Sequence, residues 1–159
     1  MPKGTMTKSR GFTLIEILVV VAIIGILSSV ILVGLGPTRA RGRDARRIAD
    51  LRQVQTGLEL YFGKCGFYPG TATCTGSGAV PAGGWVGLQT ALTSAGIGIS
   101  NIPDDPNSSL NYFYGVNGAG NGYTLGATLE DPANPALNNS VKGFSNGVNC
   151  GGVVYCIQL

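Results

Sequence analysis

The chain has 159 residues, enough for one ordinary domain, and only 12% of them are charged, against roughly 25% in a typical soluble domain. It contains no histidine, which removes the commonest general base and the commonest metal ligand. The net charge of +3 comes from the first ten residues, because beyond Gly11 eight basic residues balance eight acidic ones. The basic pI of 8.8 is therefore poor evidence for a nucleic-acid partner.

An apolar segment covers residues 12–35, and Glu16 is its only charged residue. As a helix that rises about 1.5 Å per residue it would be roughly 36 Å long, enough to cross a hydrocarbon core of about 30 Å. We therefore predict that the segment inserts into a membrane. The alternative is a cleaved secretory signal, whose apolar region spans only about 7 to 15 residues. Signal cleavage near Ser28 remains an alternative. Cleavage at the small residues 34–36 is not expected, because Pro37 follows them.

The orientation of this segment depends on two opposing signals. Arginines follow it closely, and the positive-inside rule would place them in the cytoplasm. All four cysteines also follow it, and four cysteines without histidine suit two disulfides in an oxidising compartment. We give the cysteines more weight and expect the C-terminal part to be exported. The arginines are Arg39, Arg41, Arg43, Arg46 and Arg47, and the cysteines are Cys65, Cys74, Cys150 and Cys156.

Glu16 lies near the start of the apolar segment, where an ionised carboxylate is costly unless it is paired. In a membrane-inserted precursor its head group could reach water, because Arg10 is only a few residues away. Once the helix is buried among others, the carboxylate needs a positive partner. Glu16 is therefore a candidate functional residue.

Residues 8–16, Lys-Ser-Arg-Gly-Phe-Thr-Leu-Ile-Glu, resemble the N-terminal signal of type IV prepilins and type II secretion pseudopilins. The likeness consists of a short basic leader, then Gly-Phe-Thr-Leu-x-Glu, then an unbroken apolar helix. It implies that a prepilin peptidase and methyltransferase cuts between Gly11 and Phe12 on the cytoplasmic side and methylates the Phe12 amine. It also implies that Glu16 pairs with the Phe12 amine of a neighbouring subunit during assembly, on a chain that keeps its apolar helix.

An amphipathic helix is predicted beyond Pro37, because apolar residues recur there at spacings of three and four. Pro37 and the glycines before it could break the helix locally, or the glycines could serve close helix packing. Gly63 is a plausible helix end. The arginines either bind lipid head groups or acidic residues of neighbouring subunits, or form a solvated helix face. The apolar stripe consists of Ile48, Leu51, Val54, Leu58 and Tyr61 or Phe62.

The remainder of the chain is predicted to form a small domain with antiparallel strands. Residues 65–69, Cys-Gly-Phe-Tyr-Pro, resemble the Gly-x-Tyr-Pro turn that follows the long helix in this family, and favour major pseudopilins and short bacterial pilins. Strands are predicted at 112–116 and 123–129, joined as a β-hairpin, and at 153–159. Between them the sequence predicts a loop at 70–84, a short helix or turn at 85–95, a turn at 102–107 and a polar loop at 131–149.

The four cysteines allow three disulfide connectivities. We favour Cys65–Cys74 and Cys150–Cys156, because each pair closes a short local loop. A long clamp from the end of the helix to the last strand stays open as the alternative.

A calcium site is the one cofactor that the sequence suggests. Asp104, Asp105 and Asn107 offer the clustered oxygen ligands that Ca²⁺ takes, and the resemblance implies that a calcium site in these C-terminal loops is common. The sequence lacks a clear match to that loop, and a polar turn is the favoured interpretation.

These features together predict an α+β pilin fold, in which a long N-terminal helix packs on a small antiparallel sheet. The predicted parts are a leader at 1–11, a transmembrane and filament-core helix at 12–36, an amphipathic extension at 37–63 and a globular domain at 64–159. The predicted function is that of a structural subunit of a type IV pilus-like filament, with a major pseudopilin of a type II secretion system as the alternative. A membrane-anchored surface enzyme or adhesin is the alternative of another class, but the sequence has no nucleophile elbow and no phosphate-binding glycine loop.

The partners that follow are further copies of the chain, the prepilin peptidase, an assembly platform and, before assembly, membrane lipid. The precursor is expected to be single-pass in the inner (cytoplasmic) membrane, and the mature protein to form a filament at the cell surface or in the periplasm.

Overall fold

The structure is a computed structural model that describes residues 11–74 and 84–159, apart from the side chains of residues 30–35. Most of the expected leader at 1–11 and much of the expected loop at 70–84 therefore lie outside the described residues. The chain divides into two compact units, one that ends at Thr38 and one that runs from Arg39 to Leu159.

One helix, α1 (Leu14–Cys65), carries 52 residues and passes from the first unit into the second. It continues through Pro37, so the local break that the sequence allowed there does not occur. The helix also continues past Gly63 and stops at Gly66, whose φ is 78°. The N–H of Gly66 donates to the carbonyl of Phe62 at 2.7 Å. This is the left-handed glycine cap that ends many helices, and it places the stop three residues later than predicted.

Within the described residues, none of the helices combines the length and the apolar character that a membrane crossing requires. The predicted span at 12–36 includes residues 30–35, whose side chains lie outside the described part.

The globular unit is built on a three-stranded antiparallel sheet of β1 (Tyr112–Val116), β2 (Tyr123–Thr128) and β5 (Val154–Gln158), in the order β1-β2-β5. Its first hairpin and last strand match the predicted strands to within one or two residues. The short helix α2 (Gly84–Ser94) lies where a helix or turn was predicted. The predicted fold class is confirmed, since a long helix packs on a small antiparallel sheet.

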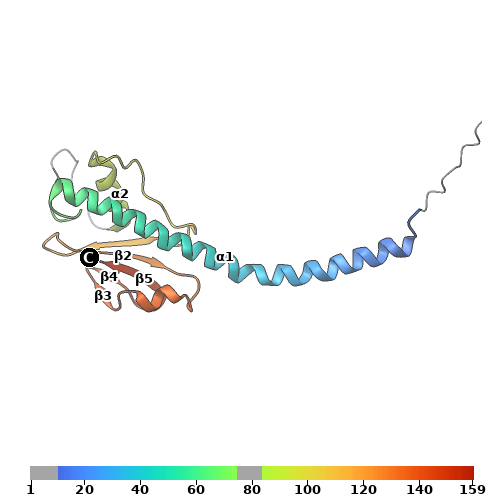
Figure 1. Ribbon diagram of the computed structural model, residues 1–159. Coiled ribbons are helices and arrows are strands. Elements are labelled where there is room, and N and C mark those ends of the chain that lie inside the picture. Colours follow the sequence, from blue (N-terminus) through green and yellow to red (C-terminus); the bar gives the residue numbers. More distant parts are fainter. Residues whose placement is uncertain (1–10, 75–83) are drawn as a thin grey trace, which may run out of the picture. The chain divides into compact units, whose positions relative to one another are not determined.

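The two faces of the sheet have different coverings (Figure 1). One face presents large apolar side chains toward α1 and α2, and forms the core with the buried stripe of α1. This stripe is the one predicted from the three- and four-residue spacing, and Leu51, Val54 and Leu58 are at most 1% exposed. The sheet side chains of this core are Tyr112, Tyr114, Tyr123, Leu125, Ala127, Tyr155 and Ile157.

A second, smaller hairpin covers the opposite face, and the sequence interpretation missed it. The 3₁₀ helix η1 (Pro135–Asn139) and the strands β3 (Phe144–Ser145) and β4 (Val148–Asn149) lie in the stretch that was predicted to be a polar loop. The hairpin approaches the sheet where Gly115 and Gly126 leave its surface flat. A Cβ atom on Gly115 would collide with the backbone carbonyl of Asn146.

We expect Gly115→Ala to destabilise the globular unit by roughly 1–3 kcal/mol, because the added methyl group must displace hairpin backbone in a packed site. Thermal unfolding followed by near-ultraviolet circular dichroism would measure the loss. Gly118→Ala is the matched control, since a Cβ atom at Gly118 meets nothing within 4 Å. Equal melting temperatures for the two variants would contradict this description of the hairpin.

Candidate functional site

The start of α1 is fixed by a reciprocal pair of hydrogen bonds between Thr13 and Glu16. The Oγ1 atom of Thr13 accepts from the N–H of Glu16 at 3.3 Å. The carboxylate of Glu16 reaches back, and its Oε2 atom accepts from the N–H of Thr13 at 2.8 Å and from the Thr13 hydroxyl at 2.9 Å. This is a capping box, which satisfies helix-end N–H groups that have no partner inside the helix.

The capping box gives Glu16 a role that the sequence interpretation did not assign. Its signature, Thr-x-x-Glu directly before an apolar run, is readable from residues 13–16. Both bonds from Thr13 end on the same oxygen, Oε2. The carboxylate is thus held at the helix start while its second oxygen points to no partner among the described residues.

Around this cap, the apolar surface of the first unit is exposed on all sides. The side chain of Phe12 is 85% exposed, and large apolar residues from Leu14 to Leu27 are between 48% and 82% exposed. A soluble monomer rarely leaves so large a continuous apolar surface in water. The structure therefore contains a surface that another apolar body must cover.

Gly11 and Phe12, the predicted processing residues, precede the helix in exposed chain without regular secondary structure. A Cβ atom on Gly11 would meet nothing within 4 Å, so the fold itself does not require glycine there.

A second polar cluster surrounds Arg47, whose side chain is 0% exposed. Its Nη1 atom lies 2.8 Å from Asp44, and its Nε and Nη2 atoms donate to the two carboxylate oxygens of Asp105 at 2.8 and 2.9 Å. The Nη2 atom also lies 2.8 Å from Glu130. One buried guanidinium group therefore binds carboxylates from α1, from the turn at 103–107 and from the turn after β2.

The neighbouring arginines are also paired within the globular unit. Arg41 pairs with Asp131, Arg43 with Glu130, and Arg46 with Asp50. The interpretation of the cluster as a solvated face is therefore wrong for Arg47, which is fully buried, whereas the side chains of Arg41 and Arg46 stay 72% and 61% exposed. Sequence could not reveal the pairing, because the partners of Arg41 and Arg43 lie 90 and 87 residues further along the chain.

The same cluster bears on the suggested calcium ligands. Asp105 commits both carboxylate oxygens to Arg47, while Asp104 is exposed. Over residues 11–74 and 84–159, no three acidic, histidine or cysteine side chains come together in a way that could hold a metal ion. The turn at 103–107 is thus bound by an internal cation.

The pKa of Glu130 is strongly perturbed by the arginines of the cluster. Hydrogen bonds from Arg43 and then from Arg47, which outweigh the effect of burial, lower the pKa of Glu130 to about 2. The N–H of Ala133, and then Arg41, also hold the pKa of Asp131 below its ordinary value.

We expect the melting temperature to be flat above about pH 5 and to fall between about pH 4.5 and pH 2. An unfolded glutamate takes up its proton near pH 4.3, whereas folded Glu130 stays ionised down to its pKa of about 2. Its stabilising contribution is therefore present above the unfolded pKa and is lost as the pH falls through the folded one. Thermal unfolding of the full chain in detergent micelles over this range would measure the slope. Glu130→Gln should flatten it, and an unchanged slope would contradict the pairing.

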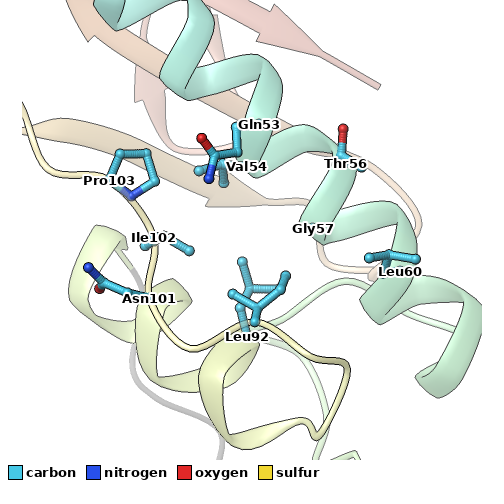
Figure 2. A pocket seen from close by; sticks show the side chains of 10 residues that line it. Gln53, Val54, Thr56, Gly57, Leu60, Leu92, Asn101, Ile102 and Pro103 are labelled. Carbon is cyan, nitrogen blue, oxygen red and sulfur yellow. The ribbon is translucent and has the colours of Figure 1, made fainter.

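An apolar cavity of about 280 Å³ lies between α1 and the chain at residues 99–103. Figure 2 shows Leu92 between these two segments. The described lining of the cavity contains amide and hydroxyl groups but no charged side chain. The cavity therefore offers space for an apolar group and no acid–base pair. The lining residues are Gln53, Val54, Thr56, Gly57, Leu60, Leu92, Ile99, Asn101, Ile102 and Pro103.

Two disulfide bonds cross-link the globular unit. Cys65 is bonded to Cys74, and Cys150 is bonded to Cys156, the two local pairings that the sequence favoured. The first closes the turn after α1, and the second joins the chain after β4 to β5. Disulfides of this kind persist in oxidising compartments.

Comparison with known proteins places these features in one family. Residues 6–32 match the model described as the prokaryotic N-terminal methylation motif. Fimbrial protein Q of Moraxella bovis is 30% identical over 136 residues, which cover 86% of this chain and 78% of that protein. The type II secretion system core protein G of Escherichia coli (strain K12) is 35% identical over 54 residues, or 34% of this chain. The type IV major pilin protein PilA of Myxococcus xanthus (strain DK1622) is 29% identical over 99 residues, or 62% of this chain and 44% of that pilin.

The chain belongs to the type IV pilin and pseudopilin family. The match to the E. coli secretion protein spans only 37% of the length of that protein. No solved structure matches the chain significantly.

Proposed function

We propose that this protein is the structural subunit of a type IV pilus-like filament, whose core is built by the apolar half of α1. One observation carries the proposal: a helix start that is apolar and exposed all round, with a single carboxylate held at its tip. Burial of this surface among identical helices would contribute about 25 cal/mol per Å² of apolar area removed from water. Membrane lipid would cover the same surface before assembly.

The proposed role of Glu16 is to receive the α-amino group of Phe12 from a neighbouring subunit. Removal of the leader after Gly11 would create that amine, and methylation would keep its positive charge. A carboxylate buried without a partner is strongly destabilising, whereas a paired one is tolerated. The pair would therefore fix the register of each new subunit more than it would add net stability.

The geometry of the cap supports this role. Because Thr13 engages only Oε2, the carboxylate is oriented by its own helix and still has an oxygen for a second donor. The exposed position of Phe12 leaves that residue free to reach another subunit.

A pseudopilin of a type II secretion system is the second candidate, and the 35% identity over 54 residues to a secretion core protein favours it. The longer match, over 86% of this chain, is to a fimbrial protein. Filaments sheared from the cell surface would support the pilus, whereas subunits confined to the periplasm and required for export of other proteins would support the pseudopilus. The surface enzyme or adhesin has no comparable support, and the charge-free lining of the apolar cavity gives an enzyme no acid–base pair there.

The proposal predicts that Gly11→Val leaves an uncut precursor in the membrane, because the peptidase would no longer accept the residue before the cut. The measurement is N-terminal sequencing of the membrane-bound and filament fractions. Gly63→Val is the matched control, since both glycines are exposed and a Cβ atom at either position meets nothing within 4 Å. A mature first residue other than Phe12, or normal cutting of Gly11→Val, would refute this part of the proposal.

A further inference from the structure

The attachment of α1 to the globular unit changes character along the helix. From Ile48 onward the helix is held by apolar side chains, and among the described residues the core takes none from α1 before Ile48. The preceding two turns of the helix are held instead by ion pairs and hydrogen bonds of charged side chains. Their contacts with the rest of the unit come from Arg41, Arg43, Asp44 and Arg47. We call these four residues, with Asp105, Glu130 and Asp131, the polar clasp.

The clasp is centred on two fully buried side chains of α1. Asp44 accepts the N–H groups of Glu130 and Asp131, each at 2.9 Å, while Arg47 binds Asp105 and Glu130. The side chains of Asp44 and Arg47 are both 0% exposed, and that of Asp105 is 1% exposed. The clasp therefore joins the helix to two separate turns in one fixed geometry.

Such an attachment is specific but contributes little net free energy. The electrostatic attraction within a buried ion pair roughly offsets the free energy lost when the two charges leave water. Apolar residues of the same volume would therefore hold the helix at least as well. Regions with few buried apolar contacts are the ones that open locally while the rest of a protein stays folded. The clasp meets this description, and the apolar stripe that begins at Ile48 does not.

We propose that the polar clasp is a local opening unit, in which residues 40–47 of α1 separate from the turns at 103–107 and 129–131 while the docking from Ile48 onward persists. Residues 40–47 would span about 12 Å of helix at about 1.5 Å per residue. One consequence rests on the proposed function. In the filament, opening of the polar clasp would let the globular unit shift against residues 40–47 of its own helix without unfolding.

Hydrogen exchange offers a test with a built-in comparison. The N–H groups of Glu130 and Asp131 are protected by Asp44, whereas that of the adjacent Leu129 donates to Val153 at 2.9 Å in the sheet edge. The full chain in detergent micelles would be studied by nuclear magnetic resonance at low denaturant concentrations. We expect Glu130 and Asp131 to exchange faster than Leu129, with rates insensitive to denaturant because only local structure opens.

Arg47→Met should then accelerate exchange at Glu130 and Asp131 by about tenfold or more, at rates that stay insensitive to denaturant. Leu129 should also exchange faster, because the closed form is destabilised against the unfolded chain too, but its rate should depend on denaturant. Arg52→Met is the matched control, since Arg52 is an exposed arginine of the same helix and should change neither rate. If Arg47→Met does not fold, Arg43→Met weakens the clasp from its exposed side and should give the same denaturant-insensitive acceleration at Glu130 and Asp131.

Equal exchange at all three amides in the unmodified protein would overturn the proposal, because the clasp would then open only on global unfolding. So would an Arg47→Met variant in which exchange at Glu130 and Asp131 becomes as sensitive to denaturant as exchange at Leu129. The measurement uses single subunits, so its outcome does not depend on whether the protein polymerises.

Discussion

Glu16→Ala is expected to abolish filament assembly while the chain is still inserted and cut. The substitution removes the only carboxylate of the apolar segment, and with it the proposed partner of the Phe12 amine. An amine buried in a filament core without a counter-charge is strongly destabilising. Loss of the cap costs about 1 kcal/mol at the helix start, too little to unfold a helix of 52 residues. Electron microscopy and shearing of filaments, with N-terminal sequencing of the membrane fraction, would measure both steps.

Two further variants separate the charge of Glu16 from its capping role. Glu16→Gln keeps an oxygen that can reach the Thr13 N–H, because glutamine also completes a capping box, but it removes the charge. Thr13→Ala keeps the charge and removes the hydroxyl group of the cap. We expect Glu16→Gln to fail in assembly as Glu16→Ala does, and Thr13→Ala to assemble at reduced yield. Unchanged filament yield from Glu16→Gln would end the charge-pairing hypothesis.

Arg47→Met is expected to destabilise the globular unit by about 3–5 kcal/mol, since it leaves buried carboxylates without their cation. This is a large part of the roughly 5–15 kcal/mol that stabilises an ordinary domain. Chemical unfolding of the full chain in micelles, followed by near-ultraviolet circular dichroism, would measure it. Arg52→Met should stay within about 0.5 kcal/mol of the unmodified protein, as exposed substitutions usually do.

A double variant tests whether the loss comes from the pairing. Among the described residues of the helix, Asp105 accepts hydrogen bonds only from Arg47, through its two carboxylate oxygens. Removing both charges, in Arg47→Met with Asp105→Asn, should cost less than the sum of the two single losses, because neither partner is left buried and unpaired. Strictly additive losses would show that the two side chains do not interact.

Local periodicity made much of the fold predictable. The spacing of Leu51, Val54 and Leu58 gave the docked face of α1, and alternation with turn residues gave the hairpin of β1 and β2. The helix end was placed at Gly63 because glycine is a common stop, but the positive φ that marks the stop belongs to Gly66. Sequence alone does not show which of two nearby glycines takes the left-handed conformation.

The features that were missed depend on contacts between distant segments or on very short elements. The strands of the second hairpin have two residues each, too few to show an alternation of apolar and polar residues. The turn signal Asn146-Gly147 nevertheless stands between them. The burial of Arg47 depends on Asp105 and Glu130, 58 and 83 positions away, and a run of arginines ordinarily indicates a solvated face. The start of α1 was predictable in full, since Thr13 and Glu16 are three residues apart.

The capping box also has an electrostatic consequence for the start of α1. A helix carries partial positive charge at its first turn, which attracts carboxylates and repels cations. Glu16 compensates this charge on its own helix through Thr13, so an amine created at Phe12 would meet a helix start whose partial positive charge is already offset. The same carboxylate would thus lower the electrostatic cost of a new cation beside the first turn.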